Sequence, residues 1–120
     1  MSITVDLAGQ IALVTGGTKG IGAGIADRLA EAGATVVVCG RNQPSAGDHA
    51  FLVCDVRDPD QVAALIDAIV AEHGRLDLAV NNAGGSPAAD AADASPRFSE
   101  AIIRLNLLAP MHVAQAANRV

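Results

Sequence analysis

Short apolar runs alternate along this chain with stretches whose apolar residues recur every three or four positions. The runs are rich in Val, Ile and Leu, and each is followed within two residues by Gly, Asp or Asn. This pattern is typical of short strands that are buried on both faces. We predict four strands on this basis, at Ile11–Val14, Thr35–Cys39, Ala50–Val53 and Leu76–Val80.

Two helices are predicted between these strands. The first follows the Gly-rich segment 15–22 and ends at Gly33, and the second begins at a cap formed by Asp58, has Pro59 in its first turn and ends at Gly74. Their apolar faces consist of Ile21, Ile25, Leu29 and Ala32 in the first helix and of Val62, Leu65, Ile66, Ile69 and Val70 in the second.

A third helix is predicted after the fourth strand and the small, polar loop Ser86–Ala94. Ser95-Pro96 opens it, and Pro110 lies inside its periodic pattern, where a proline is expected to kink the helix. Its apolar side consists of Phe98, Ile102, Leu105 and Leu108.

The order of these elements predicts the fold class. Strands that alternate with crossover helices form an α/β, Rossmann-like, doubly wound parallel sheet, of which this chain supplies the N-terminal strands. Ligands of such sheets bind beyond the carboxyl ends of the strands. The loops that start at Thr15, Gly40, Asp55 and Asn81 are therefore expected to meet at one edge of the sheet.

Composition and charge narrow the function classes. The chain has 120 residues, which suits one domain, and its net charge of −5 argues against a surface that binds nucleic acid. It has no apolar run long enough for a membrane span and no signal-peptide pattern at residues 1–7, so we expect a cytoplasmic protein that does not bind membranes.

Cys39 and Cys54 are interpreted as buried free thiols, with a disulfide between neighbouring strands as the alternative. The three histidines share no metal-ligand spacing, and we expect no metal site.

The Gly-rich segment Thr15-Gly16-Gly17-Thr18-Lys19-Gly20-Ile21-Gly22 joins the first strand to the first helix. Unpaired backbone N–H groups at a helix N-terminus, next to glycines that allow close approach, suit a pyrophosphate. Taken alone, the segment fits a tight structural turn equally well. Its glycine spacing differs from G-x-G-x-x-G, and no Gly-Lys-Ser/Thr follows as in a P-loop.

Four motifs together resemble the classical short-chain dehydrogenase/reductase family. The string TGGTKGIG at residues 15–22 is similar to the family's TGxxxGxG signature, and Asn81-Asn82-Ala83-Gly84 is similar to its NNAG motif. Asp55 resembles the family's acidic residue after the third strand, and Asn106 the helical Asn of its Asn-Ser-Tyr-Lys tetrad. Each motif alone fits a turn, a cap or an ordinary helical Asn, whereas their shared order favours the family.

The resemblance implies a dinucleotide-binding function and a set of site residues. Asp55 is expected to meet the adenine, and Asn106, as the one tetrad residue present, to hold a water in the proton relay. The expected cofactor-binding residues are Gly16, Thr18, Lys19, Gly20, Ile21, Gly22, Arg41, Asp55, Val56, Asn81, Asn82, Ala83 and Gly84.

The residues after the second strand predict which nicotinamide cofactor binds. An NAD site of this kind has a carboxylate there, which pairs with the ribose 2′-hydroxyl and repels a 2′-phosphate. Residues 39–42 contain no acid, and Arg41, with Lys19 in the adjacent loop, suits a 2′-phosphate. We therefore expect NADP(H) to be preferred over NAD(H).

The family's general acid/base is a Tyr in a Tyr-x-x-x-Lys motif, with a Ser that orients the substrate, and this chain has no Tyr. We therefore interpret residues 1–120 as a cofactor-binding domain that stops before these residues and is inactive alone. The expected function is oxidoreduction of a carbonyl and a secondary alcohol, by a full-length form that is a homo-oligomer. The alternatives are a non-catalytic dinucleotide-binding module or inactive remnant, and a methyltransferase, which would need an acid after the second strand.

Overall fold

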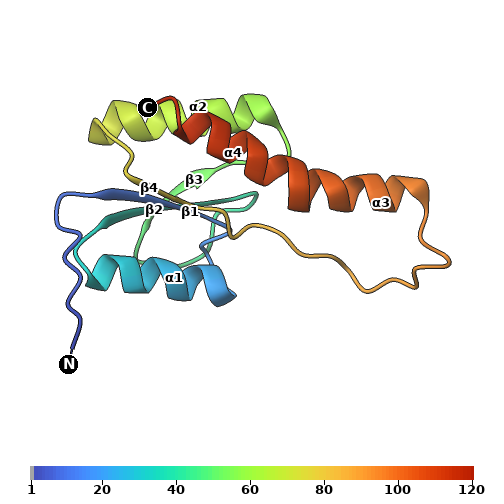
Figure 1. Cartoon of the computed structure of the whole chain (residues 1–120), viewed down its shortest axis with the longest axis horizontal. Coiled ribbons are helices and arrows are strands. Elements are labelled where there is room, and N and C mark those ends of the chain that lie inside the picture. Colours follow the sequence, from blue (N-terminus) through green and yellow to red (C-terminus); the bar gives the residue numbers. More distant parts are fainter. Residues whose placement is uncertain (1) are drawn as a thin grey trace.

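The computed structural model describes residues 2–120 and contains one parallel sheet between two layers of helices (Figure 1). Its strands are β1 (Ile11–Thr15), β2 (Thr35–Gly40), β3 (Ala50–Val53) and β4 (Leu78–Val80), in the spatial order β3-β2-β1-β4. All pairings are parallel, with Leu13 beside Val37 on one side and beside Ala79 on the other. The predicted doubly wound α/β class is confirmed.

The helices cover the two faces of this sheet. Helix α1 (Gly20–Glu31) lies on one face, and α2 (Pro59–His73) and α4 (Ala109–Ala117) lie on the other. Helix α3 (Pro96–Ile103) extends beyond the sheet, and in Figure 1 the loop from β4 runs outward below it to its first turn. No helix in residues 2–120 is both long and apolar enough to cross a membrane.

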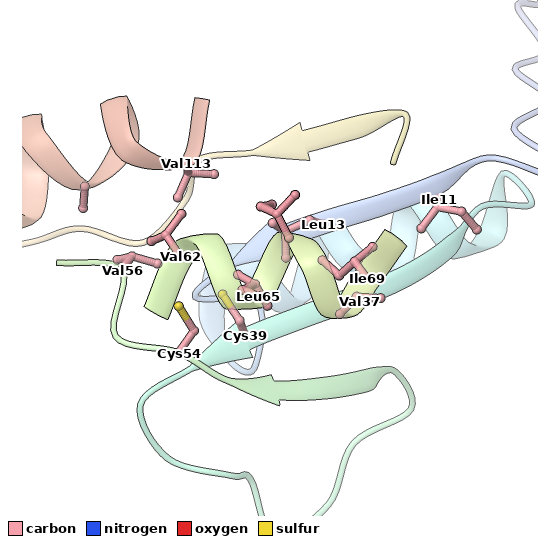
Figure 2. Packing of buried hydrophobic residues seen from close by; sticks show 12 residues of the cluster. Ile11, Leu13, Val37, Cys39, Cys54, Val56, Val62, Leu65, Ile69 and Val113 are labelled. Carbon is pink, nitrogen blue, oxygen red and sulfur yellow. The ribbon is translucent and has the colours of Figure 1, made fainter. Parts of the chain in front are cut away.

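Two apolar clusters hold the layers together. The cluster between the sheet and α2 and α4 includes Leu13, Ile66, Ile69 and Val113, all at most 2% exposed (Figure 2). The cluster on the α1 side is built from smaller side chains, among them Ala12, Val14 and Ala26. Alternate residues of β1 enter the two clusters, so the buried run Ile11–Val14 serves both faces, as the sequence predicted.

The helix boundaries follow the predicted capping residues. The Asp58 carboxylate accepts a hydrogen bond from Asp60 N at 2.9 Å, and Ser95 Oγ accepts one from Phe98 N at 3.0 Å. Gly74 ends α2 with a φ of 80°, a left-handed conformation that favours glycine. These three predictions from the sequence are confirmed.

One expectation, the start of the fourth strand, needs correction. The fourth strand begins at Leu78 and not at Leu76. Asp77 N still donates to Ile11 O at 2.9 Å, but Ile11 N donates at 2.8 Å to the Asp77 carboxylate and not to a backbone carbonyl. The helix around Pro110, where a kink was expected, continues through that residue. It widens into a π-helical turn, η1 (Arg104–Leu108), closed by Ala109 N donating to Arg104 O, and Pro110 then falls in the first turn of α4, where its missing N–H is tolerated.

Candidate functional site

A cleft of about 840 Å³ opens at the carboxyl edge of the sheet. The loops after β1, β2, β3 and β4 all contribute to it, as the topology predicted. Of the residues expected to bind a cofactor, those that line this cleft are Gly16, Thr18, Lys19, Gly20, Arg41, Asp55, Val56, Asn82, Ala83 and Gly84.

The loop between β1 and α1 lines this cleft and leads into the N-terminus of α1. Gly16 and Gly20 have φ values of 64° and 59°, and a side chain at such angles would be strained. Helix α1 begins at Gly20 without any side chain capping its first turn. The first N–H groups of a helix have no intrahelical partner, and the dipole makes this end positive. The cleft therefore contains a site suited to an anion.

Thr15 and Asn82 fix the shape of this loop. The Thr15 hydroxyl, 1% exposed, accepts hydrogen bonds from Asn82 N at 3.1 Å and Ala83 N at 3.0 Å and donates to Val80 O at 3.4 Å. The Asn82 amide Nδ2 donates in turn to Thr15 O at 3.0 Å and Gly16 O at 3.1 Å. The turn after β4 thus holds the turn after β1.

Two glycines of the loop are required by close packing. A Cβ at Gly22 would lie 2.3 Å from Gly16 O and 2.4 Å from Asn82 Nδ2. A Cβ at Gly17 would lie 2.5 Å from Val38 Cγ1. Gly22 is therefore a buried packing position, where the N-terminus of α1 passes against the loop, and it does not line the cleft.

Asp55, which also lines the cleft, forms a two-pronged ion pair with Arg57. Arg57 Nε donates to Asp55 Oδ1 at 2.9 Å, and Arg57 Nη2 donates to Asp55 Oδ2 at 2.8 Å. The Arg57 backbone N–H adds a bond of 3.0 Å to Oδ1. These bonds from Arg57 lower the pKa of the Asp55 carboxyl and outweigh the effect of its partial burial.

The cleft is electropositive in an acidic chain. Lys19, Arg41 and Arg57 line it, and Asp55 is the only carboxylate among its lining residues in the described part of the chain. Neither Lys19 nor Arg41 forms an ion pair with a carboxylate of residues 2–120. Two cationic side chains are thus free to meet an anionic ligand.

The loop that carries Arg41 is held at its far end. His49 Nε2 lies 2.8 Å from Asp27 Oδ1 on α1, and the His49 side chain is only 15% exposed. Between these points, residues 42–46 line the cleft. The contact between His49 and Asp27 joins the end of this loop to α1.

Besides Gly22, three predicted site residues lie outside the cleft lining. The Asn106 amide binds the backbone of Gly85, and Asn81 Nδ2 donates to Pro110 O at 3.3 Å. Ile21 is 80% exposed at the start of α1. Asn81 and Asn106 therefore connect the turn after β4 to the η1–α4 segment.

Sequence reasoning missed several residues that line the cleft. Arg57 is the most consequential of them, and its signal was a cation two residues after Asp55, close enough to pair with it. Cys39 and Cys54 were treated as core residues, although both also line the cleft. The remaining unanticipated lining residues are Gly40, Asn42, Gln43, Pro44, Ser45, Ala46 and Leu105.

Comparison with known proteins identifies the family. The model of the short chain dehydrogenase family matches residues 10–120. The chain belongs to the short-chain dehydrogenase family. It is 36% identical to (+)-borneol dehydrogenase 1 of Salvia officinalis, in a match that covers 99% of this chain and 50% of the relative. It is also 36% identical to D-threitol dehydrogenase of Mycolicibacterium smegmatis, in a match that covers 99% of this chain and 51% of that relative. The chain thus spans about half the length of the curated relatives it matches.

Solved structures of the family superpose closely on this fold. The ligand-free aldohexose dehydrogenase of Thermoplasma acidophilum gives a TM-score of 0.88 at 32% identity, over 97% of this chain and 44% of that one. The active-site complex of Pseudomonas aeruginosa RhlG with NADP gives a TM-score of 0.86 at 34% identity, and the match covers 98% of this chain and 50% of that one. The four-stranded arrangement is therefore half of a short-chain dehydrogenase fold.

Proposed function

We propose that this chain is the dinucleotide-binding part of an NADP(H)-dependent oxidoreductase that interconverts a carbonyl and a secondary alcohol. The observation that carries the proposal is the cleft in which an uncapped helix N-terminus lies together with two unpaired cations, Lys19 and Arg41. Membership of an oxidoreductase family sets the reaction class.

The residues present fit a dinucleotide. The cleft volume of about 840 Å³ lies within the range of about 300–1,000 Å³ that small-molecule and cofactor sites occupy. A Cβ at Gly20 would meet nothing within 4 Å, so the space in front of the α1 N-terminus is open. The backbone N–H groups there would hold the pyrophosphate, since they are unpaired and lie at the positive end of the dipole.

Arg41 and Lys19 would bind the 2′-phosphate that distinguishes NADP(H) from NAD(H). The guanidinium of Arg41 can offer two parallel N–H groups to a phosphate, and Lys19 supplies a second positive charge from the glycine loop. No carboxylate stands among residues 39–42 to repel that phosphate. The NADP in the active site of RhlG, a relative at 34% identity, supports the same preference.

Asp55 and Val56 would form the adenine side of the site. The carboxylate is held in place by Arg57, and its lowered pKa keeps it ionised as a hydrogen-bond acceptor. Asn82, Ala83 and Gly84 would form the opposite wall toward the nicotinamide, backed by Thr15. When bound, the nicotinamide supplies a hydride donor or acceptor.

Only part of the chemistry is assigned to these 120 residues. The sequence contains no Tyr, so the general acid/base expected from the family is not among them. We propose that Asn106 supports the proton relay by holding the loop after β4 in place, because its side-chain amide already hydrogen-bonds both the N–H and the C=O of Gly85. The proposed substrates are small carbonyls or alcohols, and the proposed assembly is a homo-oligomer. Two buried free thiols suit a reducing compartment, for which we propose the cytoplasm.

Fluorescence titration of the purified protein with NADPH and with NADH tests the proposal. We expect NADPH to bind with at least tenfold lower Kd, roughly the contribution of one charge-assisted contact. Equal affinity for both would overturn the NADP(H) preference, and binding of neither would overturn the dinucleotide site.

A further inference from the structure

The β2–β3 crossover, residues 41–49, connects two parallel strands without a helix. Such a connection usually takes a dozen or more residues and contains a helix that packs on the sheet. Here the crossover is joined to α1 through one contact, in which His49 Nε2 lies 2.8 Å from Asp27 Oδ1. Across residues 2–120, this is the only hydrogen bond that the crossover forms with the rest of the protein.

The middle of the crossover has open space on two sides. Pro44 and Ala46 line the cleft, and the same two residues also line a second cavity of about 170 Å³, to which Asp27 of α1 and His49 contribute as well. Packing fixes a segment only where neighbouring atoms surround it. Residues 44–46 therefore have room to shift toward α1 or toward the cleft unless another contact holds them.

The contact between Asp27 and His49 is suited to hold the crossover. The His49 side chain is 15% exposed, whereas that of Asp27 is 61% exposed. Ion pairs with an exposed partner add little to the stability of a fold. However, Asp27 follows the buried residue Ala26 in the middle of α1, so its backbone position is fixed by the core. The contact thus ties the crossover to a rigid helix.

We propose that Asp27 and His49 are a positioning pair that determines where the crossover lies and, through it, how Arg41 meets a 2′-phosphate. The inference rests on the proposed function, in which Arg41, the first residue of the crossover, binds that phosphate. Without the contact, residues 44–46 can move into the second cavity, and Arg41 is held less firmly at the phosphate. Asp27 and His49 lie outside the cleft lining and act only through the crossover.

The charge of Asp27 separates this role from a direct electrostatic effect. Removal of a carboxylate near an anion-binding cleft makes the local potential more positive, which by itself should lower the Kd for NADPH. Loss of the positioning contact should raise that Kd. Because the two effects have opposite signs, the direction of the change identifies the one that dominates.

The test is fluorescence titration of Asp27→Ala with NADPH and with NADH. We expect the Kd for NADPH to rise by about two- to tenfold, the range of one lost hydrogen bond, and the Kd for NADH to change by less than about twofold. Asp48→Ala is the matched control and should raise neither Kd. Asp48 is an exposed carboxylate that lines the same second cavity but forms no ion pair within the described residues.

Variants of His49 add a rescue and a double-mutant cycle. His49→Phe keeps an aromatic ring but lacks the N–H group, and it should raise the Kd for NADPH as Asp27→Ala does. His49→Gln retains an N–H donor and should recover part of the affinity. In the Asp27→Ala background, His49→Phe should have no further effect, because the contact is already lost.

The proposal is overturned if Asp27→Ala lowers the Kd for NADPH or leaves it unchanged, or if the Kd values for NADPH and NADH rise equally. NMR order parameters of the Ser45 and Gly47 amides, measured without dinucleotide, test the positioning role separately from the proposed function. We expect them to fall in Asp27→Ala, and unchanged values would overturn the positioning role even in a protein that binds NADPH. A fall in a protein that binds neither dinucleotide would support the positioning role and overturn the proposed function alone.

Discussion

The side-chain amide of Asn106 holds the backbone of Gly85 from both sides. Its Oδ1 accepts from Gly85 N at 2.8 Å, and its Nδ2 donates to Gly85 O at 2.8 Å. Nδ2 also donates to Ile102 O at 3.0 Å, within the same helix. The π-helical turn that contains Asn106 is thereby joined to the loop after β4, which contributes Gly84 to the cleft.

Replacing Asn106 with Ala should release this loop. The variant loses both bonds to Gly85, so we expect destabilisation of about 1 kcal/mol and faster amide exchange at Gly85. Hydrogen exchange followed by NMR measures both. Asn118→Ala at the exposed end of α4 is the control and should change neither. Unchanged exchange at Gly85 in the Asn106 variant would contradict the role.

Two glycines of α1 provide a matched pair. Gly22→Ala places a Cβ 2.3 Å from Gly16 O, so we expect a loss of stability of about 1–3 kcal/mol. A Cβ at Gly24 meets nothing within 4 Å, and Gly24→Ala should stabilise the helix by about 0.5–1 kcal/mol. Urea unfolding with an unchanged m-value measures both. Similar effects of the two variants would show that helix propensity, and not the contact with Gly16, decides the result.

Arg57→Met should change the pH dependence of stability. Because the Asp55 pKa lies below its ordinary value of 3.8 in the folded protein, the pair stabilises the fold above that pH and ceases to do so as pH falls through the folded pKa. The variant should be less stable by up to about 1 kcal/mol at neutral pH, and the difference should vanish in acid. Urea unfolding across this pH range measures it.

The control for that experiment is Arg28→Met. Arg28 pairs with Glu31 at 3.2 Å, but both side chains are mostly exposed, at 83% and 67%. Screening by water should make this pair contribute almost nothing at any pH. An Arg57 variant whose loss of stability is the same at acid and neutral pH would show that packing, and not the charge on Asp55, is what Arg57 provides.

Arg41→Asp tests the assignment of the 2′-phosphate. We expect the Kd for NADPH to rise by about 10- to 100-fold, the range of a lost charge-assisted contact, while the Kd for NADH changes little. Arg97→Asp carries the same charge change on exposed α3, outside the cleft lining, and should affect neither. If the Arg41 variant raised the Kd values for NADPH and NADH equally, Arg41 would not be the residue that binds the 2′-phosphate.

The sequence predicted the order of the elements and the position of the cleft because both depend on local signals. Apolar runs mark the strands, and Asp58, Gly74 and Ser95 mark helix ends that lie next to them in the sequence. The parallel topology then places the loops that follow the strands at one edge of the sheet. The glycine loop was interpretable only together with the later motifs at Asp55, Asn81–Gly84 and Asn106, because the segment alone fits a structural turn equally well.

Side-chain partners between distant segments were not predictable. Thr15 and Asn82 are 67 residues apart, and neither the pattern nor the motif indicates that one hydroxyl accepts two backbone N–H groups. The π-helical turn before Pro110 was not predicted, because the way in which a helix accommodates a proline depends on contacts made elsewhere. Arg57 was overlooked because a cation in a turn usually faces solvent.

The bonds among Thr15, Gly16 and Asn82 have a consequence for the thermodynamics of ligand binding. The glycine loop already has its shape before any ligand arrives, because the turn after β4 holds it. A ligand therefore does not have to order this backbone, which would otherwise cost about 1–2 kcal/mol per residue. Because the loop is preorganised, less of the free energy of the ligand contacts is spent on ordering the chain, and more of it contributes to affinity. Association also proceeds without a slow folding step.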